Sequence, residues 1–247
     1  MSAPEQEQIN DTHMPLTQHL QELRKRLTIM LGAILVVFLT AWNFTPYILE
    51  VIKQPILSFT QPQFDTLTDP FFTHMKAAFF TAVFLTFPVS LSQIWLFIAP
   101  GLYKSEKMVV WPFLVLSFPL FVGGAAFFYF IVFPYAVDFL INFDKTLVPS
   151  LRIGDYLSFT VRLLFIFGLV FEMPLITLLL TRMGIVNHKG MNKFRRYWIV
   201  VAFVGAAILT PPDILTQVLL GIPLMVLYEI SVIVSWIARK KVPKEAT

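Results

Sequence analysis

The chain has little charge and no cysteine. Charged residues make up 14% of its 247 residues, where soluble domains carry about 25%, and hydrophobic residues make up 57%. The absence of cysteine excludes disulfide bridges, thiol catalysis and cysteine metal sites. The sequence also lacks a phosphate-binding glycine loop, a metal-ligand cluster and a nucleophile with an adjacent base. It therefore predicts no enzyme, no cofactor, no metal site and no nucleic-acid partner.

Long apolar runs occupy most of the chain. A hydrocarbon core about 30 Å thick is crossed by roughly 20 apolar residues in a helix. The runs are continuous rather than alternating, which favours helices over a barrel, since backbone groups must pair with one another in lipid. We expect an all-α integral membrane protein whose six transmembrane helices cover residues 27–49, 77–103, 108–137, 156–181, 197–212 and 214–238.

Proline shapes this predicted bundle. The fifth and sixth helices are joined by Thr210-Pro211-Pro212-Asp213, which predicts a tight turn between two short helices. The external segments 46–74 and 134–155 are expected to form structured loops, with Asp69 as N-cap and Pro70 in the first turn of the second helix. Prolines inside the spans should bend their helices into a curved bundle. They are Pro88, Pro112, Pro119, Pro174 and Pro223.

Basic residues indicate the orientation. Of the 19 lysines and arginines, 14 lie before the first helix, in the second and fourth connections and after the last helix. Because such residues accumulate on the cytoplasmic side, both termini are expected there. Residues 1–18 are predicted to be a flexible cytoplasmic tail, 19–238 the six-helix membrane domain, and 239–247 a basic cytoplasmic tail.

Two carboxylates are expected at the cytoplasmic interface. Glu22 lies four residues before Arg26, the spacing of a helical ion pair, and Glu106 follows Ser105 at a helix start. Each has an ordinary structural explanation. Together they could bind adjacent arginines of a ligand, since guanidinium pairs with carboxylate in a bidentate fork. One exposed pair contributes under about 1 kcal/mol, so an apolar part of the ligand would have to add contacts.

Glu172 lies inside an apolar run, where a carboxylate is by default a functional hypothesis. Arg162 is too far along the same helix, about 15 Å, to pair with it. Three further polar residues in the spans, Gln93, Gln217 and Glu229, are expected to form interhelical hydrogen bonds unless they too are functional. Solvated positions in the tail and loops are expected for His13, His19, His74 and His188.

Five segments, in order, resemble the TatC family, the receptor subunit of the twin-arginine protein translocase. The resemblance extends from about residue 19 to residue 236 and agrees with the predicted sides of the six helices. The segments are HLQELRKR at 19–26, PFFT at 70–73, QIWLFIAPGLYKSE at 93–106, FEMP at 171–174 and LTPPD at 209–213.

The resemblance implies a receptor that binds signal peptides carrying paired arginines at the cytoplasmic face. With TatA and TatB subunits, in a multimeric complex of the cell inner membrane, such a receptor exports folded proteins by using the proton-motive force. The implied fold is a cup-shaped bundle of six helices with short helices 5 and 6. The predicted signal-peptide residues are Glu22, Glu106, Arg24, Phe97 and Tyr103, and the predicted transport or assembly residues are Glu172, Pro55, Asp213, Gln93 and Gln217.

Two other functions fit the same residues. A proton-coupled small-solute carrier could use Glu172, and it would show solute-dependent proton flux without partner proteins. An inert assembly scaffold would bind its ligands independently of Glu22 and Glu106.

Overall fold

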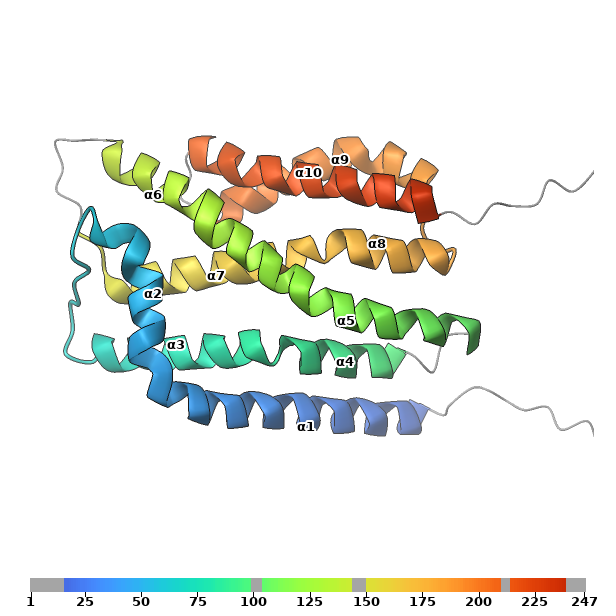
Figure 1. Cartoon of the computed structure of the whole chain (residues 1–247), viewed down its shortest axis with the longest axis horizontal. Helices are drawn as coiled ribbons and strands as arrows, with labels where there is room; N and C mark the ends of the chain where they lie inside the picture. Colours follow the sequence, from blue (N-terminus) through green and yellow to red (C-terminus); the bar gives the residue numbers. More distant parts are fainter. Residues whose placement is uncertain (1–15, 99–103, 144–149, 210–213, 239–247) are drawn as a thin grey trace, which may run out of the picture.

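The computed structural model describes residues 16–98, 104–143, 150–209 and 214–238. These residues are almost entirely helical, as the apolar runs predict, and the helices lie side by side in Figure 1. In this part of the chain the only pairing of extended backbone is a parallel bridge between Gln63 and Arg152.

The first helical segment is longer than predicted and changes direction. It consists of α1 (Leu16–Ala41), a short 3-10 turn (Trp42–Phe44) and α2 (Thr45–Leu57), and Figure 1 shows α2 running across the direction of α1. The expected helix 27–49 was therefore wrong at both ends. Pro46 lies in the first turn of α2. The N–H groups of a first turn have no partner within the helix, so proline, which lacks an N–H, is tolerated there. The chain therefore continues as a helix where a loop was expected.

The second predicted span is a bent pair of helices. α3 (Asp69–Leu85) and α4 (Phe87–Ile98) meet at an angle of 50°. Pro88 lies in the first turn of α4, as expected for a proline-induced bend. The carbonyl of Ala82, close to the break, accepts both the backbone N–H of Thr86 at 3.0 Å and its hydroxyl at 2.7 Å.

The next two spans also contain irregular turns. α5 (Lys104–Phe127) leads through a π-helical turn (Phe128–Val132) into α6 (Phe133–Asn142), so Pro134 begins a helix rather than the expected loop. α7 (Ile153–Phe171) and α8 (Met173–Arg182) are separated at Glu172, and Pro174 lies in the first turn of α8. The remaining helices are α9 (His188–Leu209) and α10 (Ile214–Ala238).

α5 passes diagonally over α7 in Figure 1, and the two backbones approach closely where they cross. A Cβ atom added at Gly124 would lie 2.6 Å from the carbonyl oxygen of Phe167. One added at Gly168 would lie 2.5 Å from the ring of Phe121, a fully buried side chain. The glycines therefore permit the close approach around which the phenylalanine core packs.

Four helical segments are long and apolar enough to cross a membrane among the described residues, and the bent pair α3 and α4 makes a fifth. α9 is not one of them, because basic side chains occupy its first half. The four segments are Thr17–Leu57, Phe113–Asn142, Ile153–Arg182 and Thr216–Ala238. The fold is that of an all-α, multi-pass membrane protein.

Candidate functional site

The start of α1 packs against α4 through a charged pair. Nη2 of Arg26 lies 3.0 Å from a carboxylate oxygen of Glu22, which confirms the predicted helical ion pair. Nη1 of the same guanidinium donates a 3.2 Å hydrogen bond to the side-chain carbonyl of Gln93 on α4. Only 20% of the Glu22 side chain and 21% of the Arg26 side chain are exposed, so the pair is largely enclosed by protein.

An aromatic stack lies beside this pair. The rings of His19 and Phe97 are 4.3 Å apart between centroids and inclined by 25°. His19 is exposed, as expected, although it lies in a helix. His74 is half-buried and hydrogen-bonded at 2.7 Å to Thr45, contrary to the expectation of a solvated position. Both lie in helices that begin earlier than the hydropathy pattern indicates. We call His19, Glu22, Arg26, Gln93 and Phe97 the α1–α4 cluster.

The other predicted signal-peptide residues are placed differently. Arg24 lies with Gln21 and Lys25 around a shallow cavity of about 420 Å³ on α1. Glu106 is in the first turn of α5, but its side chain is outside the described part of the structure, as are Tyr103 and Asp213 altogether.

Among the carboxylates whose side chains the structure describes, Glu172 is the most deeply enclosed. It joins α7 to α8, and only 3% of the residue is exposed. Neither carboxylate oxygen has a hydrogen-bond partner among the described residues, although the Ser117 side chain of α5 lies nearby. The Ser117 hydroxyl is itself buried and unpartnered there. An unpaired buried carboxylate is costly, so this position is available to bind a proton or a polar group.

The remaining predicted polar residues connect α9 to α10 or lie within a helix. The Gln217 amide donates a 2.9 Å hydrogen bond to the carbonyl of Phe203, which confirms its interhelical role. Glu229 forms an exposed ion pair of 2.6 Å with Arg195. Pro55, expected in a loop, lies inside α2 and is half-buried.

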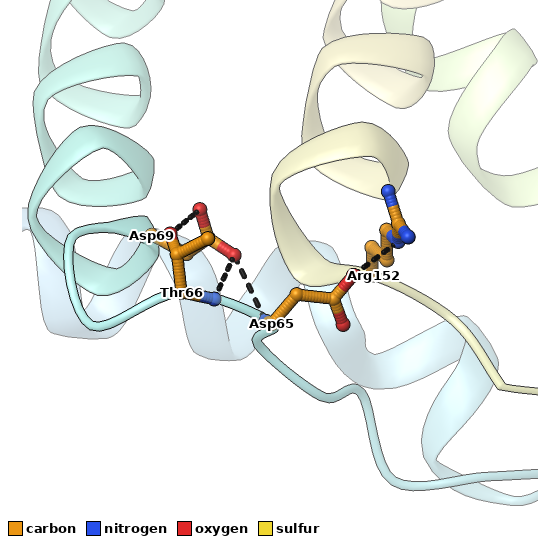
Figure 2. A network of polar contacts seen from close by, with 4 residues as sticks. All are labelled: Asp65, Thr66, Asp69 and Arg152. Carbon is orange, nitrogen blue, oxygen red and sulfur yellow. Dashed lines mark hydrogen bonds and ion pairs between the residues drawn. The ribbon is translucent and has the colours of Figure 1, made fainter.

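At one end of the bundle, a polar cap joins the start of α3 to the start of α7 (Figure 2). The amide and carbonyl of Gln63 bond to Leu151 and Ile153, each at 2.9 Å, and Arg152 pairs with Asp65 at 2.5 Å. Asp69 is the first residue of α3 rather than its N-cap, and its carboxylate accepts bonds from the preceding Thr66 and Asp65. The expectation that this connection is structured is confirmed here.

Chemically, the described residues offer isolated carboxylates and stacked rings, and they contain no group of three metal-ligating side chains. Carboxylates and ring faces of this kind can accept contacts from cationic groups. The fold and these sites together define a multi-pass membrane protein built from bent helices.

Comparisons with known proteins identify the family. The sequence model of the family described as "Sec-independent protein translocase protein (TatC)" matches residues 18–223, and the chain belongs to this family. The TatC of Magnetococcus marinus is 43% identical over 240 residues, covering 94% of this chain and 88% of its own. The TatC of Aquifex aeolicus is 42% identical over 234 residues, covering 92% and 97%. The family transports proteins, so the prediction of a non-enzymatic membrane protein is confirmed.

A solved structure supports the same assignment. The crystal structure of a twin-arginine translocase receptor TatC is 39% identical in sequence, with a TM-score of 0.80. The match covers 89% of this chain and 99% of that one. The predicted resemblance to TatC is thus confirmed in both sequence and fold.

Proposed function

We propose that this chain is the receptor that binds twin-arginine signal peptides for the export of folded proteins. Its family supplies the activity, and the observation that carries the peptide site is the largely enclosed Glu22 carboxylate between α1 and α4. TatA and TatB subunits are the proposed partners, in a complex driven by the proton-motive force.

The α1–α4 cluster suits a guanidinium ligand. Arg26 bonds one oxygen of Glu22 and is itself held by Gln93, so the carboxylate is fixed in orientation. A carboxylate has about four lone-pair sites, and the second oxygen can therefore accept another guanidinium. The adjacent stack of His19 on Phe97 offers a flat surface on which a guanidinium or an apolar side chain can lie. Arg24, Glu106 and Tyr103 are proposed to complete the site.

The binding test uses labelled signal peptide and protein in lipid nanodiscs. We expect Glu22→Gln to weaken binding of the arginine-pair peptide about 10-fold or more, because the buried charge-assisted bond is lost. A lysine-pair peptide should bind weakly to both proteins, since lysine cannot form the bidentate fork. Adding Glu106→Gln should remove the remaining arginine selectivity.

The matched control is Glu50→Gln, which changes an exposed carboxylate on α2. It should leave peptide affinity unchanged. If the double variant Glu22→Gln with Glu106→Gln binds the arginine-pair peptide as tightly as wild type does, these carboxylates are not the binding site. That result would favour the scaffold alternative.

We further propose six membrane crossings with both termini in the cytoplasm. The crossings are α1, α3 with α4, α5 with α6, α7 with α8, α9, and α10. The 22 residues of α9 measure about 33 Å in a helix, enough to cross if its basic first half reaches into the headgroup layer. α9 and α10, with 22 and 25 residues, would be the two shortest crossings.

The absence of native cysteine makes this topology directly testable. We expect a cysteine placed at Gln61, in the cap region, to react with a membrane-impermeant maleimide on intact spheroplasts. One placed at Lys189, at the start of α9, should react only after permeabilisation. Labelling of both in intact spheroplasts would contradict the three crossings proposed between them, because an odd number of crossings places the two positions on opposite sides.

Five positions are proposed to act in transport or assembly, namely Glu172, Pro55, Asp213, Gln93 and Gln217. The alternative of a small-solute carrier rested on Glu172 alone, and membership of a protein-translocase family removes its support.

A further inference from the structure

A cavity of about 640 Å³ lies between α1, α3 and α7 and contains two cationic side chains. Its polar lining residues are Lys76 of α3 and Ser158 and Arg162 of α7. No residue of α2 or α5 contributes to its wall. The other lining residues are apolar: Phe38, Met75, Phe79, Phe80, Phe165 and Ile166.

The two cations are held on neighbouring helices without a counter-charge. The Ser158 hydroxyl donates a 2.7 Å bond to the carbonyl of Gly154 and accepts a 3.1 Å bond from the Lys76 ammonium. Arg162 is one turn further along the same face of α7, about 6 Å away. None of the ion pairs formed among the described residues includes Lys76 or Arg162. The cavity therefore carries two unneutralised positive charges.

If the starts of α3 and α7 lie at the membrane surface, the backbone of Lys76 is a few Å below the headgroup layer and that of Arg162 about 6 to 9 Å below it. The polar cap of Figure 2 fixes the starts of α3 and α7 beside one another. Lys76 lies seven residues, about 10 Å, along α3, and Arg162 lies nine residues, about 14 Å, along α7. Each headgroup layer is roughly 5 to 8 Å thick. Both side chains are long enough to extend their charges back to the level of lipid phosphates.

We propose that this cavity binds one anionic phospholipid, with its phosphate between Lys76 and Arg162 and an acyl chain along the phenylalanine wall. Charge complementarity selects an anion, and the apolar wall around the cations selects a ligand with a hydrocarbon part. A membrane helix bearing a carboxylate is the rival occupant. The lipid fits better because its charge lies at the headgroup level, whereas the carboxylate of a helix at this depth would have to be carried into hydrocarbon.

Native mass spectrometry of the detergent-purified full chain with added phosphatidylglycerol tests this site. We expect wild type to retain one tightly bound phosphatidylglycerol in preference to phosphatidylcholine. Replacing both cations, in Lys76→Gln with Arg162→Gln, should weaken that lipid about 30-fold, since each basic residue near the membrane surface contributes about a 5-fold effect. Arg162→Lys should retain most of the affinity, and this folded variant keeps the test valid if the double variant is unstable.

Lys53→Gln is the matched control, because it removes one cation from α2 outside the cavity. It should bind phosphatidylglycerol as wild type does, and millimolar inorganic phosphate should not displace the lipid. Unchanged lipid affinity in Arg162→Gln, equal affinity for phosphatidylcholine, or displacement by phosphate would each overturn the proposal. So would capture of a glutamate-bearing transmembrane peptide at Arg162 in place of the lipid.

Discussion

Gly124→Ala is expected to lower the free energy of unfolding by about 2 kcal/mol, and Gly124→Leu to prevent folding. The new Cβ would lie 2.6 Å from the backbone oxygen of Phe167 and 2.7 Å from the ring of Phe171. A backbone oxygen inside a helix cannot turn away, so α5 and α7 would have to separate. Alanine has a higher helix propensity than glycine, but this stabilises the folded state by at most about 1 kcal/mol, which is too little to compensate. Thermal melting in detergent, followed by size-exclusion chromatography, measures the loss.

The neighbouring residue provides the control. Gly123 is on the same helix, but a Cβ added there meets nothing within 4 Å. Gly123→Ala should therefore melt at the wild-type temperature or slightly above it, because the substitution causes no clash and only raises the helix propensity. If both alanine variants melt like wild type, α5 and α7 do not approach as closely as the glycine contacts require.

The sequence predicts which segments are helical better than where each helix ends. Apolar runs locate the helices because lipid requires every backbone group to be paired within the segment. Pro46 and Pro134 were interpreted as the starts of loops, yet each lies in the first turn of a helix. Both interpretations follow from the same fact, that proline lacks an N–H. A first turn tolerates that loss as well as a loop does, so proline alone does not distinguish the two.

Part of the α1–α4 cluster was named from the sequence, namely Glu22, Gln93 and Phe97, but its contacts between helices were not predicted. Spacing along one helix predicts the pair of Glu22 with Arg26, because both partners are local. The bond from Arg26 to Gln93 joins residues 67 positions apart, and no local pattern indicates that α1 packs against α4. His19 was missed for the same reason: its partner Phe97 is on another helix. The apolar context of Glu172 indicates burial, but the absence of a bonding partner depends on packing against α5.

Glu172→Leu is expected to stabilise the fold by about 1 to 3 kcal/mol while abolishing export of a folded cargo. Both carboxylate oxygens are buried and lack a partner among the described residues, so the folded state bears a desolvation cost that leucine, of similar volume, does not. A polar group kept at such a cost is typical of a site where function outweighs stability. The stability of Glu172→Gln should lie between those of wild type and Glu172→Leu, since this variant removes the charge but retains unpaired polar atoms. Melting in detergent and cargo export by membrane vesicles measure the two effects.

The control for this prediction is Glu229→Leu, which removes a carboxylate that is about half exposed and paired with Arg195. An exposed ion pair contributes at most about 1 kcal/mol, so this variant should melt near or slightly below wild type. A rise in stability confined to Glu172→Leu would therefore isolate the cost of burial from any general benefit of adding leucine to the bundle. If Glu172→Leu instead lowers the melting temperature, a water or a partner group must satisfy the carboxylate in the folded protein. Loss of export would then reflect a damaged fold, and the assignment of Glu172 to transport would lose its main support.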